Sequence, residues 1–591
     1  MSSTLATTGL ACLLFAEVAH AEPVPVQVVQ TDGAWELRRD GKPYLIRGAG
    51  GTGSLEKLAA AGANSLRTWG IDDTTGDLLN RAHRLGLTVT IGIWLGHERH
   101  GFDYDDPAAV AKQLATARDA VLAHRDHPAL LMWGVGNEME GFAEGDNPKI
   151  WAAVNEVAAM IKEIDPLHPT MTITAELGGA RVASVRDLCP AVDVHGINAY
   201  GGGASIPARY RELGGQKPYV LTEYGPPGAW ETGKADWGAP YEATSTQKAE
   251  AYANTWERGI LGAPGLSLGG YAFTWGFKME ATATWFGLFL PNGNTLNAVD
   301  TLTELWSGSP PTDLSPAVTP LTIVGATQRK PGAEIDVSWT VTDPEGAPVS
   351  VTWALRRESG EYLTGGDTRP MIPNIPDAIL RSTPQNARVR LPEFPGPYRL
   401  FATATDTSGH AATANVPVLV TGESRTPLPM SVYEDSPADS PWAPSGWMGN
   451  TQGLAFNGEY QTGCHQHNCL EIIYSAKDQW AGVAWQNPPN NWGDAEGGLD
   501  LTGAKALEFW ARGAEGGEHI SVSMGLIESG KPHPDSAIVG REGVVLKSTW
   551  KRYRIPLRGE DLSSIKTAFV VTLAGRGRPK VVYLDGIRFI D

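Results

Sequence analysis

Apolar residues recur in two alternating patterns over the first half of the 591-residue chain. Short, almost continuously apolar runs are typical of strands buried on both faces, as in a parallel sheet. Amphipathic stretches between them, such as 107–124 and 149–164, are typical of helices. The strand candidates are Tyr44–Gly50, Ser65–Gly70, Leu87–Gly96, Leu130–Glu138, Thr170–Glu176, Asp193–Tyr200, Tyr219–Gly225 and Leu268–Gly276. Eight such units predict an α/β TIM (β/α)8 barrel, placed at residues 22–306.

A doubly wound open sheet is the competing fold, but no Gly-x-Gly-x-x-Gly follows the first strand. The pattern changes after a Pro-rich segment, 307–316, which we interpret as a linker. Short alternating strands with turn signals predict an immunoglobulin-like β-sandwich over 317–421. A second all-β region follows at 430–591, and its closing segment 583–589 resembles the β-sandwich of carbohydrate-binding modules. Trp480, Trp485 and Trp492 are candidates for a sugar platform there, and a purely structural sandwich is the alternative.

Two glutamates stand out at the carboxyl ends of the barrel strands, where such barrels carry their chemistry. Glu138 ends the fourth apolar run and Glu223 ends the seventh, on opposite sides of an eight-membered ring. Their side chains therefore face each other across the mouth. Cleavage of a glycosidic bond needs such a pair, one acid for the leaving oxygen and one carboxylate for the anomeric carbon. Glu98 and Glu176 also lie at strand ends and are the alternates.

The residues around this pair resemble the clan of retaining barrel glycosidases, closest to the barrel domain of family 2. The segments 129–138, 193–200 and 221–225 are similar to that family's acid/base strand, sixth strand and nucleophile strand. The resemblance implies a retaining enzyme with Glu138 as acid/base and Glu223 as nucleophile. Family 2 enzymes carry further domains before the barrel, whereas only a short segment, 22–43, precedes it here. We therefore do not transfer a family 2 substrate.

The same resemblance assigns roles to other strand-end residues. Asn137 would bind the sugar 2-hydroxyl, and Arg67 would hold Glu223 ionised. Tyr200 would donate a hydrogen bond to Glu223, and Trp275 would floor the sugar subsite. The other candidate substrate-binding residues are His97, His195 and Trp237, each with structural packing as the alternative.

The net charge of the chain limits the classes of partner that it can bind. A formal net charge of -18 disfavours nucleic acid and anionic lipid, so we expect a neutral oligosaccharide or polysaccharide and no membrane insertion. We predict a retaining β-glycoside hydrolase or transglycosidase, with β-glucan as the first substrate guess and no catalytic cofactor. A catalytically silent carbohydrate-binding barrel is the alternative. A metal-dependent barrel hydrolase would need a His-x-His after the first strand, where the chain reads 45–50 Leu-Ile-Arg-Gly-Ala-Gly.

The amino terminus predicts export. An apolar run, 10–16, precedes a small-x-small site at 19–21, so we expect residues 1–21 to be a signal peptide and the protein to be secreted or periplasmic. A buried N-terminal helix is the other interpretation. In an exported protein, Cys464 and Cys469 predict a disulfide, with a zinc site that adds His465 and His467 as the alternative. Glu434, Asp435 and Asp585 are candidate ligands of a structural calcium.

Overall fold

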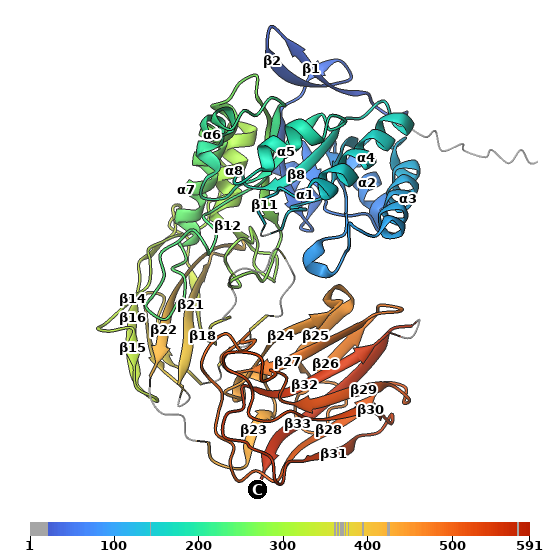
Figure 1. The fold of residues 1–591 in the computed structure, drawn as a ribbon. Coiled ribbons are helices and arrows are strands. Elements are labelled where there is room, and N and C mark those ends of the chain that lie inside the picture. The colour runs from blue at the N-terminus through green and yellow to red at the C-terminus, as the bar shows by residue number, and fades with distance from the viewer. Residues whose placement is uncertain are drawn as a thin grey trace, which may run out of the picture.

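The computed structural model describes residues 22–591, except 142, 360–361, 363–365, 367–370, 373, 376, 393–394, 422–425 and 576–577. The predicted signal peptide, 1–21, lies outside the described residues. Within the described part of the chain, no helix has the length and apolar character needed to cross a bilayer. The architecture is the predicted one, a (β/α)8 barrel followed by two all-β sandwiches (Figure 1).

Eight parallel strands close the barrel in the order β10-β11-β4-β5-β6-β7-β8-β9. The strands are β4 (Ile46–Gly51), β5 (Ser65–Arg67), β6 (Thr88–Ile93), β7 (Leu130–Val135), β8 (Thr170–Ala175), β9 (Val194–Asn198), β10 (Tyr219–Tyr224) and β11 (Ser267–Trp275). The helices outside them are α1 (Leu55–Ala60), α2 (Thr75–Arg84), α3 (Pro107–His124), α4 (Pro148–Ile164), α5 (Arg181–Leu188), α6 (Ile206–Glu212), α7 (Ser245–Thr255) and α8 (Asn297–Ser307). All eight predicted strands are present, each within a few residues of the expected bounds.

Local sequence signals set several helix starts. The Asp106 carboxylate accepts the backbone N–H of Ala108, and Pro107 occupies the first turn of α3. Asn147 and Pro148 repeat this arrangement at the start of α4. These caps fix where the chain leaves the barrel mouth and turns back along the outer wall.

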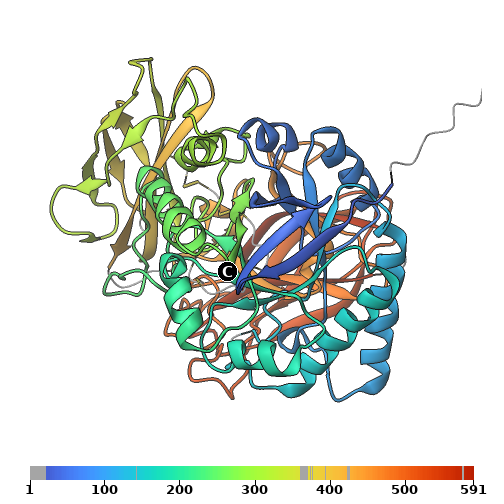
Figure 2. The same cartoon turned by 90° about the horizontal axis from the view of Figure 1, so that it is seen from above.

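An N-terminal hairpin closes the amino end of the barrel. The strands β1 (Val26–Thr31), β2 (Ala34–Arg39) and β3 (Lys42–Pro43) form a small antiparallel sheet. Val26 and Leu37 pack against the first residues of the barrel strands, such as Ile46 and Leu131. Viewed along the barrel, the hairpin crosses this end (Figure 2). The sequence interpretation had assigned no structure to this segment.

The first sandwich is built from two main sheets. One contains β18 (Ser350–Arg357), β21 (Gly396–Thr405), β22 (His410–Val420) and β15 (Gln328–Arg329). The other contains β14 (Thr322–Ile323), β16 (Glu334–Ser338), β20 (Asn386–Arg390) and β19 (Ile379–Ser382), and a two-stranded sheet pairs β13 (Ala317–Val318) with β17 (Val341–Thr342). The strand β12 (Thr295–Leu296), from the loop before α8, pairs in parallel with β22. The barrel therefore extends a sheet of the neighbouring domain.

The second sandwich also has two sheets around one apolar core. The first contains β23 (Met430–Tyr433), β25 (Leu454–Tyr460), β26 (Cys469–Tyr474), β33 (Lys580–Ile590), β28 (Ala506–Gly513) and β31 (Lys551–Pro556). The second contains β24 (Ala443–Gly449), β27 (Trp480–Gln486), β32 (Thr567–Ala574), β29 (His519–Met524) and β30 (Val539–Val545).

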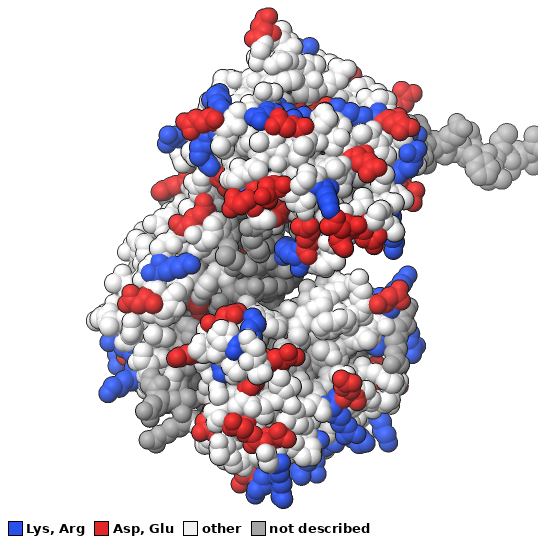
Figure 3. Space-filling view, in the orientation of Figure 1, with Lys and Arg blue, Asp and Glu red and all other residues white. Residues whose placement is uncertain are grey.

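The mouth of the barrel faces the second sandwich. The hairpin marks the amino ends of the strands, and Figure 1 shows the second sandwich at the opposite end, beyond the carboxyl ends. The first sandwich lies at the side and joins the two. Figure 3 shows a hollow between the barrel and the second sandwich, with acidic side chains along the barrel edge that borders it.

A buried ionic network joins the barrel to the first sandwich. The Lys248 ammonium donates to Glu242 at 2.5 Å, and the Asn415 amide donates to the same carboxylate at 2.6 Å. The Arg399 guanidinium donates to Glu358 at 2.9 Å and to the carbonyl of Pro240 at 2.8 Å. Each of these buried charges has a partner of opposite sign, which offsets its loss of hydration.

Candidate active site

Glu138 stands in a left-handed backbone conformation just beyond β7, with φ of 50°. Its amide donates to the carbonyl of Ile173, and its Oε1 accepts a 2.7 Å hydrogen bond from the amide of Asn198. Positive φ is uncommon for a residue with a side chain and is concentrated at functional sites. The turn after Gly136 thus brings the carboxyl group over the mouth.

Glu223, on β10, is buried and accepts three hydrogen bonds. Arg67 donates to its Oε1 at 3.0 Å and Trp69 donates to the same oxygen at 2.7 Å. The hydroxyl of Tyr200 donates to Oε2 at 2.7 Å. The predicted contacts of Arg67 and Tyr200 with this carboxylate are both present. The sequence interpretation had given Trp69 no role.

The two glutamates differ in how their charge is balanced. Burial, followed by repulsion from Glu223, raises the pKa of Glu138 to about 8, while the Asn198 hydrogen bond acts in the opposite direction. The arginine beside Glu223, Arg67, makes no hydrogen bond or ion pair with Glu138 among the described contacts. Glu138 is therefore protonated at neutral pH next to a carboxylate held by a cation.

Asn137 is fixed between the two glutamates. Its Oδ1 accepts from Arg67 at 2.6 Å and from Asn198 at 3.3 Å. Because the oxygen is engaged, the Asn137 amide N–H groups remain for another acceptor. Asn198 is itself oriented by the hydroxyl of Thr222, which donates to its Oδ1 at 2.8 Å.

Aromatic side chains wall one side of the pair. Phe273 of β11 meets Trp69 and Tyr200 edge to face, with ring centroids 5.8 Å apart in both cases. Trp230, from the loop after β10, lies 5.8 Å from Tyr200 and is 45 % exposed. Tyr362, from the first sandwich, packs against the same cluster. Burial above all, and then the Glu223 charge, raises the pKa of Tyr200, so its hydroxyl stays a donor.

A third carboxylate lies near this wall. Glu280, in the loop after β11, is buried and pairs with Lys278 at 2.7 Å. The Lys278 ammonium lies 4.9 Å from the Phe273 ring centre. The negative charge of Glu280 adds to the rise of the Glu138 pKa. Sequence reasoning missed this pair because the loop has no strand periodicity and no signal other than two adjacent opposite charges.

The two alternate glutamates have other partners. Glu176 accepts a bidentate pair from Arg209 at 2.7 and 2.8 Å. Glu98 accepts from the amide of Asn147 at 2.9 Å. Both glutamates therefore make structural contacts at the rim.

Two predicted sugar contacts are wrong. Trp275 is fully buried, donates to the carbonyl of Ser54, and packs edge to face on Phe289 and near Trp306 of α8, outside the barrel wall. Regular alternation would place Phe273 and Trp275 on the same face, but the register of β11 against β4 shifts between these two residues, and Phe273 faces the site while Trp275 does not. His195 is also fully buried, and its Nε2 shares a hydrogen bond with Thr174 at 2.9 Å. Burial lowers the pKa of His195 to about 3. His195 therefore has the structural packing role that was the alternative to sugar binding.

Two further candidates lie in loops at the mouth. The His97 ring is stacked on Trp94 with centroids 4.7 Å apart, and lies 5.6 Å from His100. Its outer neighbour Trp94 is 41 % exposed and presents the free face of this stack. Trp237 is half-buried between β10 and α7, with its indole nitrogen turned inward. Its role as a subsite wall stays a prediction.

The tryptophan platform expected in the second sandwich is not formed as predicted. Trp485 is fully buried in the core, whereas Trp480 is exposed and Trp492 is half-buried. Trp510 of β28 is half-buried, and the His465 ring stacks on it with ring centroids 3.8 Å apart.

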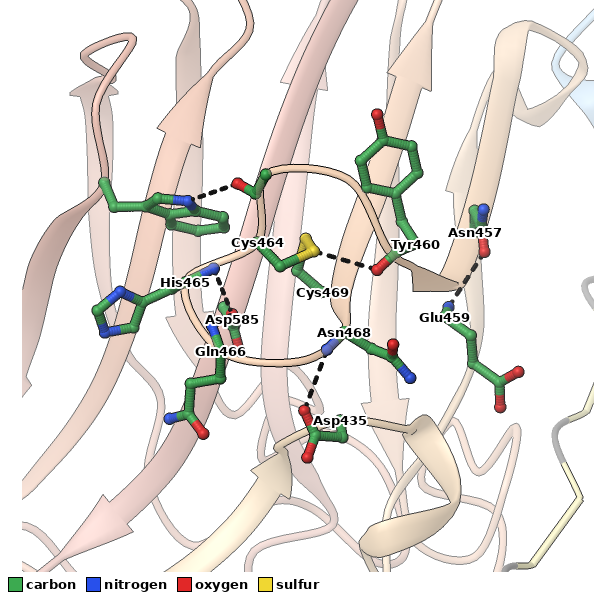
Figure 4. The surroundings of a disulfide bond; sticks show 12 residues. Asp435, Asn457, Glu459, Tyr460, Cys464, His465, Gln466, Asn468, Cys469 and Asp585 are labelled. Carbon is green, nitrogen blue, oxygen red and sulfur yellow. Dashed lines mark hydrogen bonds between the residues drawn. A yellow bond between two sulfur atoms is a disulfide. The ribbon is translucent and has the colours of Figure 1, made fainter.

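The predicted cysteine pair forms a disulfide in the second sandwich, between Cys464 and Cys469 (Figure 4). Asp585 accepts the backbone N–H groups of His465 and Gln466, each at 3.0 Å, and Asp435 accepts that of Asn468 at 3.1 Å. Two of the three candidate calcium ligands therefore anchor the disulfide loop. Across the described chain, Glu434, Asp435 and Asp585 do not form a three-ligand cluster.

The remaining cysteine among the described residues, Cys189, is free and buried. Burial raises its pKa to about 12, so it stays a thiol and is not a nucleophile.

This chain spans about half the length of the first two solved structures to which it is similar. The β-D-glucuronidase of Dictyoglomus thermophilum is 19% identical, with a TM-score of 0.38 over 48% of this chain and 54% of its own. The β-glucuronidase of Ruminococcus gnavus is 16% identical, with a TM-score of 0.39 over 49% and 53%. The β-glucuronidase of Parabacteroides merdae is 13% identical, with a TM-score of 0.34 over 96% and 63%. Among curated proteins, no sequence matches the chain.

The family comparison is more specific. Residues 72–249 match the model described as glycosyl hydrolases family 2, TIM barrel domain. The match runs from α2 through β10 into α7 and includes both Glu138 and Glu223. Residues 72–249 are therefore similar to the TIM barrel domain of glycosyl hydrolases family 2.

Proposed function

We propose that this chain is a retaining β-glycoside hydrolase that acts on a neutral extracellular or periplasmic polysaccharide, with β-glucan as the first substrate class. Glu138 is the acid/base and Glu223 the nucleophile. The observation that carries the proposal is the unequal environment of the two carboxyl groups. Glu138 has a pKa raised to about 8, whereas Glu223 accepts three donors, one of them a guanidinium. Two carboxyl groups kept in different protonation states are the basis of acid and nucleophile roles.

The reaction follows in two balanced steps. In the first, a Glu223 oxygen bonds to the anomeric carbon, the glycosidic C–O bond breaks, and the Glu138 proton passes to the leaving oxygen. In the second, Glu138, now ionised, takes a proton from water while the water oxygen replaces Glu223 at the anomeric carbon. The loss of charge on Glu223 in the first step favours ionisation of Glu138, because its repulsion ends.

The neighbouring residues prepare this chemistry. Arg67 binds both Glu223 and the Asn137 oxygen, which leaves the Asn137 amide N–H groups for a sugar 2-hydroxyl. That hydrogen bond strengthens in the transition state. Asn198 holds Glu138, and Tyr200 and Trp69 hold Glu223, so the site is organised before substrate binds.

The charges at the mouth favour a neutral sugar. Arg67 and Lys278, the two cations that contact the described residues of the site, are each paired with a glutamate. A uronate carboxylate would have to displace one of these pairs. The exposed faces of Trp230 and Trp94 suit the C–H faces of pyranose rings on either side of the bond that is cleaved. The hollow toward the second sandwich gives room for a chain of several sugars (Figure 3).

Transfer is the same reaction with a different second step, in which a sugar hydroxyl replaces water. Acceptor binding at the exposed tryptophans would favour it. We propose hydrolysis as the main outcome and a secreted or periplasmic location, in keeping with the predicted export signal.

The test is a substrate panel of aryl β-glucosides, β-galactosides, β-mannosides and β-glucuronides together with β-glucan oligosaccharides. We expect cleavage of neutral β-glycosides, with the β-anomer formed first by NMR and with longer products by mass spectrometry if transfer occurs. Preferred cleavage of β-glucuronides would overturn the neutral-substrate proposal. A first-formed α-anomer would overturn retention. Complete inactivity, with oligosaccharide binding detected by calorimetry, would favour the silent carbohydrate-binding barrel.

A further inference from the structure

A group of metal-binding side chains lies far from the mouth, where the barrel meets the first sandwich. Asp313 follows α8, and Asp406 and His410 flank the turn between β21 and β22. One potential ligand atom from each lies within 4.8 Å of the other two. No other set of three histidine, cysteine or acidic side chains in the described chain meets this criterion.

The distances within the group are too long for hydrogen bonds and short enough for a shared cation. His410 Nδ1 lies 3.7 Å from Asp406 Oδ2 and 3.9 Å from Asp313 Oδ2. A tetrahedral zinc ion with ligands at about 2.1 Å separates two ligand atoms by roughly 3.4 Å. His410 Nδ1 is therefore within a few tenths of an ångström of this separation from each carboxylate oxygen, and the three ligand atoms all lie within 4.8 Å of one another.

One oxygen aimed into the group has no hydrogen bond. The Asp406 side chain is 1% exposed, and its Oδ1 accepts the backbone N–H groups of Ser408, Gly409 and His410 at 2.8 to 2.9 Å. Its other oxygen, Oδ2, is buried without a hydrogen-bond partner, as is His410 Nδ1. A buried carboxylate oxygen without a donor is costly, and a cation would satisfy it.

The local charge also favours a cation. Asp300 of α8, whose Oδ2 accepts the amide of Ser315 at 2.7 Å, interacts with both Asp313 and His410. Three carboxyl groups thus surround one imidazole. Burial, and to a smaller extent the Asp313 charge, raises the pKa of Asp300.

We propose that Asp313, Asp406 and His410 bind a divalent transition-metal ion of the zinc class, with solvent as the fourth ligand. One imidazole and two carboxylates suit zinc, whereas calcium would take six to eight oxygen ligands. His410 is partly exposed, so solvent reaches the open position.

The ion would join three parts of the chain. Asp313 belongs to the segment that leaves the barrel, and His410 is opposite Thr295 of β12 in the parallel pair with β22. A metal here would fix the first sandwich against the barrel, and with it Tyr362 at the aromatic wall. This role is independent of the sugar chemistry at the mouth.

The test uses the full chain, stripped with a chelator and titrated with zinc chloride by calorimetry, with bound zinc counted by elemental analysis after gel filtration. The variants are Asp406→Asn, which keeps an oxygen for the three backbone N–H groups, His410→Gln, and Asp313→Asn at a half-exposed position. His465→Gln, in the other histidine-containing loop, is the matched control. We expect one zinc per chain in the wild type and the control, and affinity weaker by about 100-fold in each variant. Zinc should raise the melting temperature of the wild type and of the His465→Gln control, and not that of the three ligand variants.

The proposal is overturned if the wild type binds no zinc, or if all three variants bind it as the wild type does. The group is then a cluster of one imidazole and two carboxyl groups that holds no metal. If circular dichroism shows that one variant is misfolded, the zinc affinities of the other two variants test the proposal.

Discussion

Glu138 at the barrel mouth and Glu242 at the barrel–sandwich junction are both buried, yet their surroundings shift their pKa values in opposite directions. At the junction, burial raises the pKa of Glu242, but Lys248 and Arg399 more than compensate, and the pKa is lowered overall. At the mouth, Glu138 has an amide donor and no cation, and its pKa rises to about 8. A buried acid with a matched cation stays ionised and links the two domains, whereas a buried acid without a cation keeps its proton at neutral pH.

The largest expected effect is the loss of activity in Glu223→Gln. The amide cannot form the glycosyl ester, so we expect kcat/KM to fall by a factor on the order of 10⁴ or more. The melting temperature should also fall, because the buried Arg67 guanidinium loses its charged partner although an oxygen acceptor remains. Steady-state kinetics with an aryl β-glycoside and a thermal melt measure the two effects. An active Glu223→Gln enzyme would contradict the assignment of Glu223 as the nucleophile.

The next effect is on stability. Lys248→Met leaves Glu242 without the ammonium that lies 2.5 Å from it, and breaking such a buried pair costs roughly 3–5 kcal/mol. We expect a lower urea midpoint by tryptophan fluorescence, with kcat per folded molecule retained. Arg388→Met, which removes an exposed pair with Glu334 and Asp336, is the control and should change little. Equal midpoints for both variants would mean that the junction network is not a stabilising one.

The pH dependence of activity tests the raised pKa of Glu138 directly. Catalysis requires protonated Glu138, so kcat/KM should fall about tenfold per pH unit above about pH 8. The folded protein retains this proton between the ordinary glutamate range and about pH 8, so the group's contribution to stability also falls as pH rises through that window. A dinitrophenyl leaving group needs no proton, and its profile should lose the alkaline limb. An alkaline limb of equal size for both leaving groups would contradict the role of Glu138.

The smallest effect concerns the exposed wall. Trp230→Ala removes a ring face beside Tyr200, and we expect kcat/KM for an oligosaccharide to fall by about tenfold. An aryl monosaccharide should be affected less. Trp480→Ala, which removes an exposed tryptophan of the second sandwich, is the matched control. If the two substitutions weaken cleavage equally, the subsite at Trp230 is not supported.

The barrel could be predicted because its strands are buried on both faces and so appear as uninterrupted apolar runs. The hairpin β1–β2 escaped prediction because its strands are short, polar on one face, and stabilised by contacts with the barrel floor that only the closed ring creates. The junction network escaped for a similar reason. Glu242 and Arg399 are far apart in sequence and meet only through the packing of two domains.

At the site, residues that end a strand could be predicted, because strand ends converge in any such barrel. This holds for Glu138, Glu223, Arg67, Asn137 and Tyr200. The role of Trp275 was predicted wrongly because regular alternation places Phe273 and Trp275 on the same face of β11, whereas the register shift between them has no signal in the sequence. Glu280 and Lys278 were not predicted because they lie in an irregular loop, where no periodic pattern indicates which way a side chain points.

The central claim is the division of roles between Glu138 and Glu223, and azide rescue tests it most directly. Glu138→Ala and Glu223→Ala are each incubated with an activated aryl β-glycoside and sodium azide, and the anomeric configuration of the glycosyl azide is read by NMR. The account predicts a β-glycosyl azide from Glu138→Ala, since azide attacks the intermediate on Glu223, and an α-glycosyl azide from Glu223→Ala. The reverse pattern, with the α product from Glu138→Ala and the β product from Glu223→Ala, would contradict it.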